Sequence, residues 1–214
     1  LAAARANLNQ RLRTARPARM NAGLLVAEAA LAMVILAGAG LMGRSLARAL
    51  AVDPGFRIEP VITLAISHDE TGAQAYIQQT LEKVRSLPGV ASASAAMNAP
   101  LHGISWTTPY LVSDQPAPPA AERPWAAMNM VVPGYFRTLQ AHLLAGRFFA
   151  DSDHAHAPLV AIINQTMARK SGAAVGKRVF VQDDNQWRTV VGVVADIHQL
   201  SLTAPVQPEI FVPL

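Results

Sequence analysis

The sequence contains no cysteine, and no acidic residue occurs among its first 20 residues. The missing cysteine is compatible with either an oxidising or a reducing compartment, so it does not decide where the chain resides. The chain also lacks an initiator Met, because it begins at Leu1. Together with an apparent strand at its last residues, this start leads us to expect a fragment of a longer protein.

A polar stripe is missing from residues 22–43, where Glu28 is the single charged residue. A helix of that length rises about 1.5 Å per residue and spans roughly 33 Å, enough to cross a hydrocarbon core of about 30 Å. A soluble core helix would carry polar residues every third or fourth position. A signal peptide would have an apolar region of only about 7 to 15 residues. We therefore predict a transmembrane helix with an outward helical extension over 21–51; a cleaved signal and a core helix are the alternatives.

The arginine distribution orients this helix. Residues 1–20 contain five arginines, and Arg44 and Arg48 follow the apolar stretch. The positive-inside rule then places residues 1–20 in the cytoplasm and residues 52–214 outside. The formal net charge of the whole chain is +4, and without the five leading arginines it becomes −1. The basic character therefore belongs to the membrane flank, and we expect no nucleic acid as a partner.

Glu28 lies inside the predicted span. It either snorkels to the interface, stays neutral, or makes a polar contact with another membrane helix. Small residues at Gly23, Ala27, Ala39 and Gly43 would let such a helix approach closely. No second ionisable residue occurs in the span, so a proton relay is not expected.

The remaining chain has the pattern of an α+β domain, with long strands alternating with short helices. Predicted strands cover 61–67, 90–97, 126–132, 158–164, 178–182, 187–197 and 209–214. Predicted helices cover 71–89, a short segment from Tyr135, and 165–172. The segment 113–125 holds four prolines, and proline disrupts both central strands and helix interiors. We expect it to be an exposed connector between two lobes, 52–112 and 126–214.

Three motifs superficially resemble sites of chemistry. In "GAAVGKR" only three residues separate Gly172 from Gly176, and Arg178 replaces the hydroxyl that a phosphate-binding loop requires. In "HGISWT", Gly103 and Ser105 form half of a nucleophile elbow, but Thr107 replaces its second glycine. Pro109 would also block the helix that should follow the nucleophile. We therefore expect neither nucleotide binding nor a nucleophilic serine.

The third motif, "DSDHAH", gathers the best metal candidates. Carboxylate and imidazole are suitable ligands, but a structural site needs a closed four-ligand shell with supporting hydrogen bonds. Its candidate ligands are Asp151, Asp153, His154 and His156. A solvated loop is the expected role, so no catalytic, cofactor-binding or metal-binding residue is assigned. Trp106, Trp125 and Trp187 are expected in the core or at an interface.

Several stretches carry a family resemblance in the correct order along the chain. "LLVAEAALAMVILAGAGLMGRSLARALAVDPGFRIEPVITLAIS" resembles the membrane span and first strand of the MacB-like, FtsX-related permeases of bacterial ABC transporters. "VVPGYFRTLQAHLLAGRFF", "AVGKRVFV" and "WRTVVGVVADI" resemble signature segments of their external domain. The sequence departs from the family at "RTLQAHLLAGR", where a Gly-Ile usually follows the Leu. The basic leader and "AVDPGF" most resemble the second half of the long, duplicated members.

The resemblance implies a MacB-like periplasmic core domain anchored in the bacterial inner membrane and driven by a separate cytoplasmic ABC ATPase. It also implies other permease helices as partners, in a dimer or pseudo-dimer, besides lipid and periplasmic adaptor proteins. We therefore predict a non-catalytic permease segment that couples ATP hydrolysis to movement or export of cargo. The alternatives are a membrane-anchored adaptor or sensor and, least favoured, an anchored hydrolase, for which no triad, metal shell or carboxylate pair can be assembled.

Overall fold

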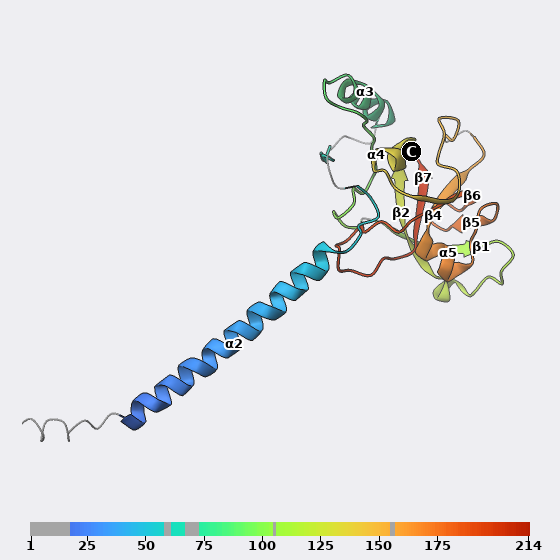
Figure 1. The fold of residues 1–214 in the computed structure, drawn as a ribbon. Coiled ribbons are helices and arrows are strands. Elements are labelled where there is room, and N and C mark those ends of the chain that lie inside the picture. The colour runs from blue at the N-terminus through green and yellow to red at the C-terminus, as the bar shows by residue number, and fades with distance from the viewer. Residues whose placement is uncertain (1–17, 58–60, 67–72, 105, 155–156) are drawn as a thin grey trace, which may run out of the picture. The chain divides into compact units, whose positions relative to one another are not determined.

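The computed structural model describes residues 18–57, 61–66, 73–104, 106–154 and 157–214 (Figure 1). The chain forms two compact units, Leu1–Ala51 and Val52–Leu214. The described part of the first unit is one helix, and all strands belong to the second.

Helix α2 (Ala18–Leu50) runs without interruption for 33 residues. Between Ala22 and Leu50 it is long and apolar enough to cross a membrane. Every residue from 22 to 48 is exposed. A helix that is apolar and uncovered all round needs an apolar environment or partner helices. The predicted continuation of the helix beyond residue 43 is confirmed, because residues 44–50 are helical.

Six strands of the second unit form a closed barrel. Its strands are β1 (Thr107–Val112), β2 (Trp125–Val131), β4 (Val160–Asn164), β5 (Arg178–Val181), β6 (Gln186–Val194) and β7 (Glu209–Pro213). They follow the order β6-β4-β7-β2-β1-β5, and β5 pairs with β6 again, which closes the sheet. The short strand β3 (Leu143–Gly146) pairs with the C-terminal end of β6. The β2–β7 and β4–β6 pairs are parallel and the other pairs antiparallel.

Alternation along the strands creates two apolar cores, because successive side chains of a strand point to opposite faces. On β4, Ala161 and Ile163 belong to one core and Val160 and Ile162 to the other. The first core fills the barrel with residues such as Val179. The second lies on the outer side of β4 and β7 and is rich in aromatic residues. Both faces of β4 are therefore covered, and all five of its residues are buried.

The two short helices of the barrel unit follow their sequence signals. Helix α4 (Tyr135–Thr138) begins after Gly134, whose φ of 95° suits a residue without a side chain. Helix α5 (Gln165–Ser171) begins at Asn164, whose side chain accepts a hydrogen bond from the Met167 N–H, and it ends at the left-handed Gly172. Both predicted helices are confirmed.

The predicted strand–helix–strand unit before the barrel is largely wrong. Helix α3 (Ala73–Arg85) is present, but residues 61–66 form no strand, and residue 67 lies outside the described residues. Residues 90–95 are not a strand either, and Ala96 makes an isolated bridge to Val131. A strand requires a hydrogen-bonding neighbour, and the structure describes none along 61–66, where Ile62 is 86% exposed.

The proline-rich segment 113–125 connects two neighbouring strands of one sheet. It contains a short 3-10 helix, η1 (Ala120–Glu122). Strands β1 and β2, on its two sides, pair antiparallel with Thr107 opposite Ala127. Residues 107–112 therefore belong to the barrel and not to a separate first lobe. The prediction overlooked β1 because Pro109 lies within it; here the Pro109 carbonyl still accepts a hydrogen bond from the Gln182 N–H.

Candidate functional site: the docking point of residues 53–57

The chain that follows α2 is fixed to the barrel unit by a tight turn. The Asp53 carboxylate accepts a hydrogen bond from the Gly55 N–H at 2.9 Å. The Pro54 carbonyl accepts one from the His198 N–H at 3.1 Å, and the Arg57 N–H donates to the Leu139 carbonyl at 3.0 Å. Two backbone hydrogen bonds therefore attach this short stretch to two distant parts of the domain.

Gly55 makes the closest approach at this docking point. Its φ is 82°, and a Cβ built there would lie 1.8 Å from the Asp196 carbonyl oxygen. Any side chain would force the two backbones apart. The next residue, Phe56, packs against the outer aromatic core. The segment is thus held by hydrogen bonds, a backbone contact and apolar packing together.

Asp196 connects the docking point to α5. Its carboxylate accepts hydrogen bonds from the Thr166 N–H and hydroxyl, both at 2.7 Å. It also pairs with Arg169 at 3.1 Å. Asp196 lies two residues after the end of β6. Its side chain contacts α5, and its backbone carbonyl contacts Gly55. Asp196 and its neighbours therefore link residues 53–57 to α5.

Two of the family-like motifs pack directly against each other beside this loop. The Arg147 N–H donates to the Val191 carbonyl at 2.9 Å. A Cβ on Gly146 would lie 2.1 Å from the Val191 oxygen, and one on Gly192 would lie 2.3 Å from the Arg147 oxygen. The two glycines allow β3 and β6 to approach closely. "LAGRFF" and "VVGVVADI" are therefore one structural unit, which contains Asp196.

Arg147 and Asp153 form a bidentate ion pair with N–O distances of 2.6 and 3.0 Å. The Asp153 carboxylate also accepts a hydrogen bond from the Ala150 N–H. The guanidinium holds the pKa of the Asp153 carboxyl below its usual range. The carboxylate closes the loop after Arg147 and is already committed to three donors.

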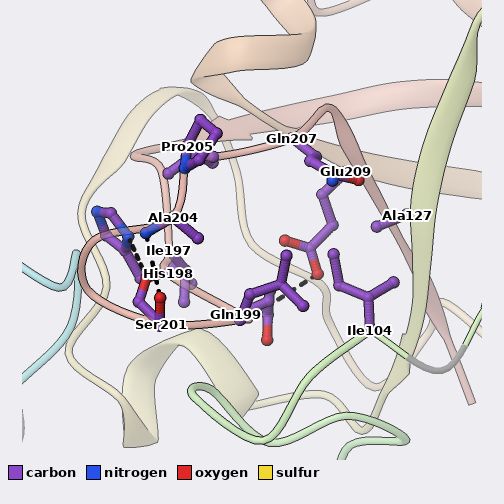
Figure 2. A pocket seen from close by; sticks show the side chains of 12 residues that line it. Ile104, Ala127, Ile197, His198, Gln199, Ser201, Ala204, Pro205, Gln207 and Glu209 are labelled. Atoms are coloured by element: carbon purple, nitrogen blue, oxygen red, sulfur yellow. Dashed lines mark hydrogen bonds between the residues drawn. The ribbon is translucent and has the colours of Figure 1, made fainter.

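A buried carboxyl group contacts the loop that follows β6. Glu209, the first residue of β7, is 3% exposed, and its Oε1 accepts a hydrogen bond from the Gln199 Nε2 at 2.9 Å (Figure 2). Its own N–H donates to the Asn164 side chain. A cavity of about 10 Å³ adjoins the pair and is lined in part by Ile104 and Ile197. That volume is close to the minimum for one water molecule.

Burial raises the pKa of Glu209 to about 8, and repulsion from Asp196 adds to the rise. Hydrogen bonds from Gln199 and Asn129 oppose it without cancelling it. Burial also raises the pKa of the neighbouring Tyr135 hydroxyl. Both shifts favour the neutral, protonated form of the group at pH 7.

Replacing Glu209 by glutamine should remove a pH dependence of stability. The folded-state pKa exceeds the unfolded value, so the folded carboxyl binds its proton more tightly. Its contribution is fully present below about pH 4.5 and is lost as the pH rises through 8. In thermal unfolding of the full chain, Glu209→Gln should match the parent at pH 5 and exceed it by at least about 1 kcal/mol at pH 9.

The matched control is Glu122→Gln, which removes an exposed carboxylate from η1. It should unfold with the same pH profile as the parent. Parallel profiles of Glu209→Gln and the parent between pH 5 and 9 would contradict the assignment of a neutral, buried Glu209.

The residues of the phosphate-loop-like motif end a helix, make backbone hydrogen bonds and begin a strand. Gly172 ends α5, and the Gly176 N–H donates to the Val190 carbonyl at 2.8 Å. The Lys177 carbonyl accepts a hydrogen bond from the Val190 N–H, and Arg178 begins β5. The motif thus leads into a strand, and it lacks the strand-to-helix order that a phosphate loop requires.

The remaining candidate residues are not brought together into one site. Ser105 and His156 lie outside the described residues. Gly103 donates its N–H to the Gln199 carbonyl, and Thr107 begins β1. Asp153 is engaged by Arg147, as described above, and His154 also makes a contact. Among the residues that can be described, no three potential metal ligands gather; the expectation of no metal site stays a prediction.

The three tryptophans lie at the surface of the barrel unit. The Trp106 indole N–H donates to the Asp183 carboxylate. Trp187 packs beside Phe180 and under the Arg178 guanidinium. Trp125 is 60% exposed. None of the three lies in a buried core. Of the two locations expected from the sequence, core or interface, the interface stays a prediction.

Sequence reasoning missed Gly55, Asp196 and Glu209 as structurally important residues. Each had a local signal: an Asp-Pro-Gly turn after the helix, an acidic residue at the end of a long strand, and a carboxylate next to an apolar strand. None of these signals names a partner, because the contacts join residues that are distant in sequence. Only the fold shows that Gly55 meets Asp196.

Comparison with known proteins identifies a family. The family model of the MacB-like periplasmic core domain matches residues 22–214. The solved periplasmic region of MacB from Actinobacillus actinomycetemcomitans is 13% identical, with a TM-score of 0.43, over 69% of this chain and 61% of that one. The extracellular domain of YknZ, an ABC-type transporter from Gram-positive bacteria, is 19% identical, with a TM-score of 0.38, over 69% of each chain. No curated protein matched.

An apolar helix followed by an α+β domain defines the class as a membrane-associated protein with a periplasmic segment. The chain belongs to the family of the MacB-like periplasmic core domain, which is found in ABC transporter permeases. The match across residues 22–214 carries this assignment, and it includes the apolar helix as well as the barrel. The chain spans 61% of the MacB region to which it is similar.

Proposed function

We propose that this chain is a non-catalytic permease segment of an ABC transporter, and that its external domain moves when a separate cytoplasmic ATPase hydrolyses ATP. The observation that carries the proposal is the short connection between helix and domain. Helix α2 ends at Leu50, and the docked segment begins at Asp53. Ala51 and Val52 alone separate a continuous helix from a stretch that is fixed to the barrel unit.

The mechanism that we propose is mechanical. A displacement of α2 is transmitted to residues 53–57, from there to the loop at Asp196, and from Asp196 to α5 through Thr166 and Arg169. Rigid-body movement of this kind repositions packed elements as units, because packed cores do not deform continuously. The domain would then present its outer surface differently in the two nucleotide states of the ATPase.

The proposed partners follow from this mechanism and from the family. They are the ATPase, other permease helices in a dimer or pseudo-dimer, membrane lipid and, on the outer side, adaptor proteins. The proposed location is the bacterial inner membrane, with residues 1–20 in the cytoplasm and residues 52–214 in the periplasm or outside the cell. The uncovered apolar surface of α2 and the five arginines among residues 1–20 support this placement.

The orientation is testable by cysteine labelling, since the chain has no cysteine of its own. Ala117→Cys, at an exposed position of the segment 113–125, should react from outside cells with a permeable outer membrane and an intact inner membrane when a membrane-impermeant maleimide is added. Asn7→Cys should react only after the inner membrane is opened. The reverse pattern would contradict the orientation and with it the proposed role of the external domain.

A further inference from the structure

A cleft of about 510 Å³ is lined by residues of β1, of the segment 113–125 and of the last turn of α5. Small-ligand sites usually have volumes of about 300 to 1,000 Å³ and are mostly apolar with a few polar groups. The cleft has that character: Tyr110, Trp125, Pro116, Pro118 and Pro124 line it, together with Lys170 from α5. It is separate from the docking point of residues 53–57, because none of those residues lines it.

The cleft is formed before any ligand binds, because its proline-rich wall is tied down along its length. The Gln115 Nε2 donates to the Ser171 carbonyl at 2.6 Å, which joins the wall to the end of α5. Ser113 exchanges two hydrogen bonds with the Arg178 backbone. The Arg123 guanidinium donates to the Gln182 side chain at 2.9 Å. Proline has a fixed φ and a short, rigid side chain, so little conformational entropy is lost on binding.

The walls provide flat apolar surfaces and a single charge. Trp125 begins β2 and is 60% exposed, so a large part of its ring is uncovered. Lys170 is the one charged residue in the lining, and no carboxylate accompanies it. Within the described residues Lys170 takes part in no ion pair. An unpaired ammonium at the rim of an apolar cleft favours one anionic group on the ligand.

We propose that this cleft binds a small monocarboxylate with a planar apolar body. The ring of the ligand lies between Trp125 and the prolines, and its carboxylate pairs with the Lys170 ammonium. Burial of the apolar body and the charge-assisted contact act together, since an exposed ion pair alone contributes little. This site goes beyond the proposed movement of the domain, and its occupancy does not depend on ATP.

The test uses the full chain in lipid nanodiscs and 6-fluoro-2-naphthoate as the probe, with binding followed by the ¹⁹F signal of the ligand. Empty nanodiscs give the background from lipid. We expect saturable binding to the parent, weakened about tenfold or more by Lys170→Gln, because the charge-assisted contact is lost. The control Lys83→Gln makes the same charge change on α3, away from the cleft lining, and should bind as the parent does.

A neutral analogue, 6-fluoro-2-naphthamide, separates the charge from the apolar body. It should bind the parent about tenfold more weakly than the acid and should be insensitive to Lys170→Gln. Absence of saturable binding, equal affinity for acid and amide, or equal loss in Lys83→Gln would overturn the proposal. Binding of a proline-rich peptide in place of the acid would also overturn it and would identify the cleft as a peptide groove.

Discussion

Replacing Gly55 by alanine is expected to abolish the response of the external domain to ATP while the barrel stays folded. A Cβ at this position would lie 1.8 Å from the Asp196 carbonyl oxygen, so residues 53–57 must leave their docking position. The interior core of the barrel does not include this segment. In the complete permease with its ATPase, we expect transport to fall about tenfold or more, within the usual range of coupling between sites.

Hydrogen exchange provides the direct measurement. The amides of Arg57 and His198 are hydrogen-bonded across the docking point, and both should exchange faster in Gly55→Ala. The parent should also show exchange differences in residues 52–214 between nucleotide-free and ATP-bound complexes, and the variant should not. Circular dichroism would verify that the strands are retained.

The matched control is Gly89→Ala. Gly89 has a φ of 88°, close to the 82° of Gly55, but no atom lies within 4 Å of the position of its Cβ. Both variants therefore carry the same cost of a left-handed alanine, on the order of 1–2 kcal/mol. Normal transport is expected from Gly89→Ala. If Gly55→Ala exposes the two amides and still transports as the parent does, the docking point does not transmit movement.

A flexible insertion in the helix should have an effect of similar size. Six Gly/Ser residues placed after Arg48 interrupt α2 just before its end at Leu50. Such residues behave as a random chain and absorb displacement, whereas a helix transmits it. We expect membrane insertion, folding of residues 52–214 and binding of the ATPase to persist, and transport to fall severely.

The control is an insertion of seven helix-forming residues at the same position. It lengthens the helix by about 10 Å and adds nearly two full helical turns. The helix stays stiff, and the residues after the insertion keep almost the same orientation around the helix axis. Transport should be reduced much less than by the flexible insertion. Equal transport by the flexible variant and the parent would identify the domain as a passive receptor, which is the adaptor alternative.

Local patterns in the sequence predicted the elements that depend on local interactions. The apolar stretch around Glu28 predicted α2, and the helix predicted over 165–172 corresponds to α5. The strands predicted over 178–182 and 187–197 correspond to β5 and β6. These features depend on residues that lie within a few positions of one another, which is why a single sequence is enough to find them.

Elements that depend on distant partners were predicted poorly. β1 contains Pro109, and β3 is four exposed residues long, so neither has a typical strand pattern. Residues 61–66 have a strand-like pattern, but no partner strand among the described residues. Barrel closure and the Gly55–Asp196 contact could not be predicted, because a hydrophobic pattern specifies which face is buried and not which strand covers it.

The position of β7 constrains how the domain folds after synthesis. β7 is the last strand of the barrel in chain order, yet it lies between β2 and β4. Until residues 209–213 have been synthesised, both of those strands present unpaired backbone groups, a state that favours aggregation. Closure also joins segments that are far apart in sequence, which makes folding slow. Biogenesis of the domain therefore has a vulnerable interval, during which a periplasmic chaperone that covers strand edges would have the greatest benefit.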